Sequence, residues 1–250
     1  MSEKYHGFIL KFAALMCAFA AGAVFLGYSA SRLIVPPATD QVSGGVSGSP
    51  VIVIDPGHGG EDGGAVAADG TLEKDLNLEL SSRVSALFGV LGIDSRMTRD
   101  TDVLLYDKYS ELDDYTGKKK VYDLKNRLRF TEESGDDAVF LGIHMNRFAD
   151  PKYSGTQVYY SPNSADSRVL AEAIRTEIKT ALQPDNTRET KKAGSSIFLL
   201  KRLKVPAVLV ECGFLSNGGE AQRLKDPEYQ KAFAAATVSA VASYISSGRS

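Results

Sequence analysis

The chain has 250 residues, of which 43% are hydrophobic and 24% charged, a composition typical of a globular protein with one sizeable folded domain. Its formal net charge of −2 argues against a nucleic-acid-binding protein and against a polybasic membrane surface. The two cysteines, Cys17 and Cys212, are too few for a disulfide scaffold and lack the spacing of a metal–thiolate site.

The N-terminal part, residues 1–35, differs in character from the rest of the chain. Residues 12–28 form an apolar segment without any charge, and small residues follow it directly. Both a cleaved signal peptide and an uncleaved signal anchor have this pattern, and we favour the anchor. Lys4 and Lys11 precede the segment, which favours a cytoplasmic N-terminus. We therefore expect the remainder of the chain to lie outside the cytoplasmic membrane.

Residues 36–50 are rich in Pro, Gly, Ser and Thr and are predicted to form a flexible linker, so the folded domain is expected at residues 51–250. Apolar runs and amphipathic stretches then alternate. They predict strands at residues 51–55, 95–99, 138–144, 155–160 and 207–214, and helices at 73–92, 123–134, 166–182 and around 229–241. Continuous apolar strands that alternate with helices predict an α/β domain with a mainly parallel central sheet flanked by helices.

Side chains with metal-site chemistry stand where these strands end. His58 follows the first strand in a glycine-rich loop, His144 ends "AVFLGIH", and Glu211 ends "AVLVE". Glu73 begins the first helix. Because ligand sites of parallel sheets lie beyond the carboxyl ends of the strands, we expect these four groups to converge. The glycines beside His58 would allow its backbone to turn close to a metal ion.

Each of these residues has a simpler explanation when it is taken alone. His58 could be a hydrogen-bonded loop residue, and His144 a histidine of the core. Glu73 could be a favourable negative charge in a first helical turn. Glu211 is harder to explain in this way, because a carboxylate after four apolar residues is costly to bury unless it is paired, metal-bound or catalytic. The prediction of a metal site therefore depends on the convergence of the four groups.

The stretch "DPGHGGEDGG" between a strand and a helix could also be a phosphate-binding loop. It matches no common phosphate-loop motif and has no lysine. Its acids Asp55, Glu61 and Asp62 would repel a phosphate. We consider this alternative unfavourable.

The motifs of the chain resemble, in order, those of the zinc-dependent N-acetylmuramoyl-L-alanine amidases of bacterial cell walls. They are "IDPGHGGEDGGA", "EKDLNLELS", "MTRD", "IHMN" and "VLVECGFLSN". The resemblance covers residues 51–247. It implies a Zn²⁺ ion bound by His58, Glu73 and His144, with Glu211 as the catalytic residue. An apolar N-terminal segment before one catalytic domain, without wall-binding repeats, is most similar to the germination-specific amidases of the spore cortex.

This resemblance implies hydrolysis of the amide bond between N-acetylmuramic acid and L-alanine in peptidoglycan. Zinc would activate a water molecule, and Glu211 would pass the proton of that water to the leaving amine. The residues alone indicate only metal-assisted hydrolysis of an amide or ester. The expected location is the cell wall or, in a spore former, the space around the forespore. The alternative is a catalytically silent peptidoglycan-binding or regulatory module of the same fold, against which the presence of all four site residues argues.

Residues 106–123 are crowded with charges and tyrosines and have no core periodicity. We predict a solvated surface excursion there. The alternative is a surface on which a regulatory protein docks.

Overall fold

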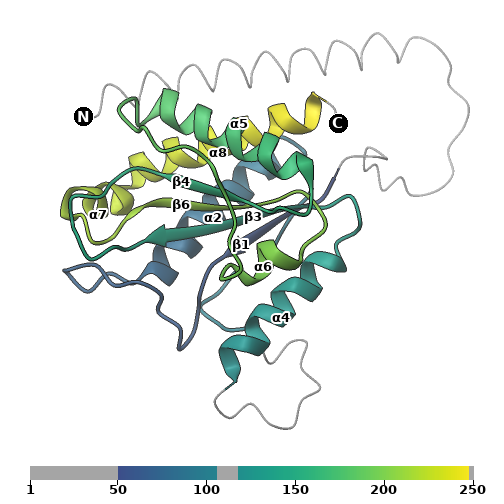
Figure 1. The fold of residues 1–250 in the computed structure, drawn as a ribbon, viewed down its shortest axis with the longest axis horizontal. Coiled ribbons are helices and arrows are strands. Elements are labelled where there is room, and N and C mark those ends of the chain that lie inside the picture. Colours follow the sequence, from purple (N-terminus) through teal and green to yellow (C-terminus); the bar gives the residue numbers. More distant parts are fainter. Residues whose placement is uncertain (1–49, 106–117, 248–250) are drawn as a thin grey trace, which may run out of the picture. The chain divides into compact units, whose positions relative to one another are not determined.

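A six-stranded sheet is the centre of the computed structural model, which describes residues 50–105 and 118–247 (Figure 1). The elements are β1 (Ile52–Pro56), α2 (Glu73–Val90), β2 (Ser95–Met97), α4 (Lys119–Glu132), β3 (Val139–Asn146), β4 (Gln157–Tyr160), α5 (Ala165–Ala181), β5 (Lys191–Lys192), α6 (Phe198–Arg202), β6 (Ala207–Phe214), α7 (Gly218–Lys225) and α8 (Pro227–Ser246). The apolar segment at residues 12–28 lies outside the described residues. Within the described ranges, no helix is both long and apolar enough to cross a membrane.

The sheet has the strand order β2-β1-β3-β6-β4-β5. Neighbouring strands are parallel throughout, except that β4 runs antiparallel to β6. Helices α2, α5 and α8 pack together on one face, and α4 and α6 cover the other (Figure 1). The predicted α/β fold with a mainly parallel sheet flanked by helices is thus confirmed.

The two faces of the sheet are covered by helices of different character. On the α4 and α6 side, Val53, Phe140 and Leu209 are buried against apolar side chains of these two helices. On the other side, α8 contacts both α2 and α5, and most of its side chains are buried, many of them alanines. Because α8 packs against more than one neighbouring helix, it is apolar almost all round. Its small side chains let it approach these helices closely.

Helix α8 also has clear start signals. The carboxylate of Asp226 caps the helix by accepting a hydrogen bond of 2.9 Å from the backbone N–H of Glu228, and Pro227 occupies the first turn. Proline is favourable there because its missing N–H would have no partner within the helix.

Several boundaries differ from those that the sequence predicts. Strand β3 continues beyond His144 to Asn146. The predicted bounds of the last strand, 207–214, are confirmed by β6, but Glu211 lies within this strand and not at its end. The register of β3 against β6 shifts between His144 and Asn146, an irregularity of the kind that redirects a side chain. Helix α4 begins at Lys119, earlier than predicted. Among residues 118–123, Asp123 alone is buried, so the predicted surface excursion at 106–123 is wrong for this residue; residues 106–117 lie outside the described part.

Candidate metal centre

The loop after β1 brings the backbone of His58 against the end of β3. The N–H of Gly57 donates a hydrogen bond of 3.0 Å to the carbonyl of Ile143. A Cβ atom on Gly57 would lie 2.1 Å from Cε1 of His144, so any side chain there would displace that imidazole. His58 itself has a φ of 62°, in the left-handed region that residues other than glycine rarely adopt. This conformation is therefore maintained by the surrounding structure.

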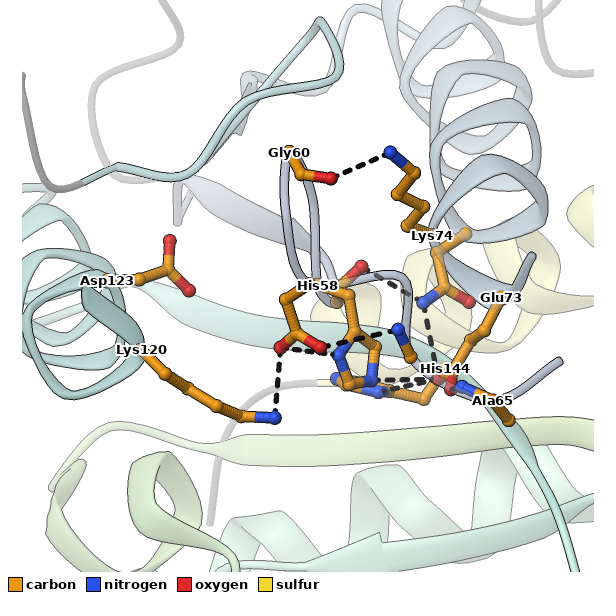
Figure 2. A network of polar contacts seen from close by, with 12 residues as sticks. His58, Gly60, Ala65, Glu73, Lys74, Lys120, Asp123 and His144 are labelled. Atoms are coloured by element: carbon orange, nitrogen blue, oxygen red, sulfur yellow. Dashed lines mark hydrogen bonds and ion pairs between the residues drawn. The ribbon is translucent and has the colours of Figure 1, made fainter. Parts of the chain in front are cut away.

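His58, Glu73 and His144 form a compact cluster (Figure 2). Nε2 of His58 lies 3.2 Å from Oε1 of Glu73, and Nδ1 of His144 lies 3.1 Å from the same oxygen. Potential ligand atoms of the three side chains all lie within 4.8 Å of one another. The two imidazole side chains are 18% and 20% exposed, whereas the Glu73 side chain is only 4% exposed. One side of the cluster is thus open to a water molecule or a substrate.

The carboxylate of Glu73 is fixed by backbone and side-chain donors. Its Oε2 accepts a hydrogen bond of 2.7 Å from the N–H of Ala65, and its Oε1 accepts one of 3.0 Å from the N–H of Met145. The amide of Asn77 donates to Oε1 at 3.4 Å and to the carbonyl of Gly57 at 3.1 Å. Glu73 therefore connects the first turn of α2 to both the His58 loop and β3.

Glu73 is held in its charged form. Burial raises the pKa of its carboxyl group, but hydrogen bonds and the charges of His144 and His58 act in the opposite direction, and the net pKa is lowered. A carboxylate that stays ionised at neutral pH is ready to bind a cation.

His58 is supported from behind by a second carboxylate. Oδ2 of Asp62 lies 2.9 Å from Nδ1 of His58, and Nζ of Lys120 lies 2.9 Å from the same oxygen (Figure 2). A carboxylate behind an imidazole fixes the orientation of the ring and increases its basicity as a ligand. The ammonium group of Lys120, on α4, positions that carboxylate in turn.

Glu211 lies beside this cluster without being a member of it. It stands opposite His144 in the register of β6 against β3. Its Oε2 is buried and has no hydrogen-bond partner among the described residues. Burial raises the pKa of this carboxyl group to about 7; His144 and His58 oppose the shift and Glu73 adds to it. A carboxyl group with a pKa near neutrality is suited to proton transfer.

A groove of about 240 Å³ opens onto these groups. Its lining includes His58, His144 and Glu211, together with apolar side chains such as Leu124 and Ile197. The prediction that His58, Glu73, His144 and Glu211 converge is therefore confirmed.

A buried charge network behind the His58 loop was not predicted. Arg127 of α4 is 1% exposed; its Nη1 lies 2.7 Å from Oδ1 of Asp55, and its Nε lies 2.8 Å from Oδ2 of Asp123. The same guanidinium donates hydrogen bonds of 2.8 and 2.7 Å to the carbonyls of Pro56 and His58. The four-residue spacing of Asp123 and Arg127 indicates a pair on one helix, but not that this pair is buried.

Arg99 supports the loop from its other side. It donates hydrogen bonds of 3.0 Å each to the carbonyls of Pro56 and Gly57, and one of 2.8 Å to the carbonyl of Lys74. Lys74 in turn donates to the carbonyl of Gly60 at 2.8 Å (Figure 2). Cationic side chains therefore bind successive carbonyls of a loop that has few side chains of its own.

Residues 52–243, nearly the whole described fold, match the family model described as N-acetylmuramoyl-L-alanine amidase. The chain belongs to this family. Because its members are cell-wall amidases, membership implies action on peptidoglycan outside the cytoplasm. The three clustered side chains of this amidase form a metal-binding triad of the type found in zinc amidases.

Three relatives illustrate the similarity. The germination-specific N-acetylmuramoyl-L-alanine amidase of Bacillus subtilis (strain 168) is 34% identical over 195 residues, which cover 78% of this chain and 79% of that protein. The N-acetylmuramoyl-L-alanine amidase AmiA of Escherichia coli (strain K12) is 27% identical over 242 residues, covering 79% and 77% of the two chains. The structure of the CwlD amidase from Clostridioides difficile, in complex with the GerS lipoprotein, matches with a TM-score of 0.74 and 37% identity over 80% of this chain and 100% of that chain.

Replacing Arg127 should strongly destabilise the amidase. Arg127→Met would leave Asp55 and Asp123 buried without their counter-charge, and we expect the free energy of unfolding to fall by about 3–5 kcal/mol. The matched control is Arg129→Met on the exposed face of the same helix, for which we expect a change of at most about 1 kcal/mol. Urea denaturation followed by circular dichroism measures both. Equal losses in the two variants would contradict the assigned role of Arg127.

The same network should make stability depend on pH. Burial raises the pKa of Asp55, but the charge of Arg127 and hydrogen bonds from Thr98 and Arg127 outweigh this effect and lower it overall. A carboxyl group whose folded-state pKa lies below its unfolded value of about 4 stabilises the fold fully above that value and progressively less as the pH falls through it. Wild-type protein should thus exceed Asp55→Asn in stability at neutral pH.

This stability difference should narrow between about pH 5 and pH 3, because only the wild-type side chain becomes protonated. Denaturant unfolding across this range measures it, with a chelator present in all samples so that metal release contributes to neither protein. A difference that stays constant with pH would show that Asp55 does not titrate in this way.

Proposed function

We propose that this amidase hydrolyses the bond between N-acetylmuramic acid and L-alanine with a Zn²⁺ ion bound by His58, Glu73 and His144, and with Glu211 as the proton-transferring residue. The observation that supports this most is the convergence of three potential ligand atoms within 4.8 Å, beside the carboxyl group of Glu211, whose Oε2 has no hydrogen-bond partner among the described residues.

The donor set fits zinc. Two imidazole nitrogens and one carboxylate form a ligand set found in catalytic zinc sites of hydrolases, which keep a further position open for water. Zinc bound there would lower the pKa of a water molecule and polarise the scissile carbonyl group. The protein contributes an ionised Glu73, which its backbone donors hold in place, and a His58 ring that Asp62 orients.

Glu211 is placed to move protons. It lies next to His144 in the sheet and lines the same groove, so a water molecule at the cluster would be close to its carboxylate. It would accept the proton of the attacking water and then donate it to the leaving amine. A pKa of about 7 makes both protonation states of Glu211 accessible at neutral pH, as this two-step role requires.

Digestion of purified peptidoglycan by the zinc-loaded protein tests the bond that is cut. The expected products are intact stem peptides with a free L-alanine amino group, identified by mass spectrometry. His58→Ala, Glu73→Ala and His144→Ala should each lose zinc and activity together. Glu211→Gln should retain close to one zinc ion per chain and lose about 10²- to 10⁴-fold in rate, the usual contribution of a positioned acid or base.

Two outcomes would contradict this assignment. A Glu211→Gln protein without zinc would make Glu211 a ligand, and a fully active one would remove it from the reaction. Tight binding of peptidoglycan without any peptide release by the zinc-loaded wild-type protein would instead favour the alternative of a catalytically silent binding module.

The biological setting that we propose is the spore cortex. It is supported by the similarity to the germination-specific amidase of B. subtilis. We further propose residues 1–35 as a signal peptide or, preferably, a membrane anchor, residues 36–50 as a linker and residues 51–250 as the catalytic domain. Since CwlD was determined with the GerS lipoprotein, a regulatory protein partner is proposed for this chain too.

Loss of the gene in a spore-forming host should leave stem peptides on cortex muramic acid positions from which the wild type has removed them. Muropeptide analysis of purified cortex measures this, and an unchanged profile would exclude the cortex role.

A reporter that works only in the cytoplasm, fused after Pro50, should be inactive; an active reporter would contradict the proposed export.

A further inference from the structure

A second groove, of about 790 Å³, runs along the same edge of the sheet. Its lining is formed by Val66, Ala67, Ala68, Arg147, Phe148, Ala149, Pro151, Leu215 and Ser216. These residues come from three segments, which follow the His58 loop, β3 and β6. The three segments therefore follow the parts of the chain that contain His58, His144 and Glu211, respectively.

Short connections join the walls of this groove to Glu73. The N–H of Ala65, next to Val66, donates to one oxygen of the Glu73 carboxylate at 2.7 Å. The N–H of Met145, two residues before Arg147, donates to the other oxygen at 3.0 Å. The walls of the groove thus continue directly from the two backbone donors that hold the Glu73 carboxylate.

The walls are also fixed to each other. The N–H of Leu215 donates a hydrogen bond of 2.8 Å to the carbonyl of Asn146, and the N–H of Phe148 donates one of 3.2 Å to Oγ of Ser216. The ring of Phe148, although 54% exposed, packs edge-on against Tyr153 with a centroid distance of 4.8 Å. These contacts hold the walls of the groove in place.

Arg147 is the one charged side chain that lines this groove. It is exposed, and the described part of the chain provides it with neither a hydrogen bond nor an ion pair. The remaining lining is mostly small or apolar. A guanidinium without a partner in a groove whose other lining residues are mostly small or apolar is complementary to a ligand that combines a carboxylate with small aliphatic groups.

We propose that this groove binds the peptide stem of the substrate and that Arg147 pairs with the free α-carboxylate of the second stem residue, D-glutamate. This inference rests on the proposed function. The amide that is cut joins two chemically different parts, an uncharged amino-sugar chain and an acidic peptide. The small apolar side chains would contact the methyl group of L-alanine, and Arg147 would bind the carboxylate that follows it.

The charges of the other groove favour the same assignment. Its lining contains two cations, Lys120 and Arg127, but each is already paired with acids of the same lining, Lys120 with Asp62 and Arg127 with Asp55 and Asp123. This groove therefore offers an acidic peptide no unpaired cation among the described residues, and it adds the carboxyl group of Glu211. Uncharged sugars with hydroxyl and N-acetyl groups suit that groove better, because carboxylates accept hydrogen bonds from hydroxyl groups. The two grooves thus discriminate between the two parts of the substrate by charge.

The test compares two soluble muropeptides that differ in one group, the α-carboxylate of D-glutamate or the corresponding carboxamide. For the carboxylate substrate, Arg147→Gln should raise KM about fivefold, the worth of a partly exposed ion pair, with kcat nearly unchanged. With the carboxamide substrate, KM and kcat of Arg147→Gln should both match those of the wild type. The matched control is Arg168→Gln, because Arg168 is an exposed arginine on α5 outside the groove lining. This variant should have the KM and kcat of the wild type with both substrates.

The decisive quantity is the ratio of kcat/KM for the two substrates, because a general loss of zinc or of folded protein lowers both values alike. A ratio in Arg147→Gln equal to that of the wild type would overturn the assignment of Arg147, while cleavage by the wild type would leave the proposed function intact. If the zinc-loaded wild type releases peptide from neither substrate, the proposed function fails, and this inference fails with it.

Discussion

The buried ion pair between Arg127 and Asp55 is the interaction on which the geometry of the metal centre depends. It joins α4, on one face of the sheet, to the carboxyl end of β1, from which the His58 loop emerges. A guanidinium buried this deeply would cost several kcal/mol without partners. Here two carboxylates and two loop carbonyls surround it, so the charge that is expensive to bury also fixes the loop.

The loop of the metal centre is consequently fixed by hydrogen bonds from outside, although it is built largely from glycine. Glycines give the backbone the conformations that the close approach to His144 requires, and they contribute no side chain that could hold the loop in place. That task falls to cations from neighbouring elements, Arg127 and Arg99, which bind the loop carbonyls. A binding site that is supported in this way can hold ligands in position before the metal arrives.

The sequence was sufficient to predict the parts of this structure that depend on local patterns. Apolar runs gave the buried strands, and a histidine or a glutamate near the end of each run gave His58, His144 and Glu211. The ion pair of Arg127 could not be found in this way, because Asp55 lies 72 residues earlier in the chain and no local pattern connects the two.

Two other features were not predicted, each for its own reason. Helix α7 begins with a pair of glycines, which are poor helix formers, and Asn217 starts this helix by capping the N–H of Glu220 at 3.1 Å. The register shift after His144 depends on the pairing of β3 with β6, which hydropathy does not report. The motif resemblance, in contrast, identified the amidase family correctly, as the match over residues 52–243 confirms. The roles of the individual ligands are our proposal.

The wide separation of His58, Glu73 and His144 along the chain has a consequence for how metal and folding are linked. An unfolded chain has these side chains far apart on average, so it has little affinity for the ion, whereas the native state gathers them. A ligand that binds the native state alone stabilises it in proportion to the logarithm of its free concentration, by about 2.7 kcal/mol at one hundred times the dissociation constant. The supply of the metal would then govern how long each molecule survives proteolysis, independently of how fast it turns over substrate.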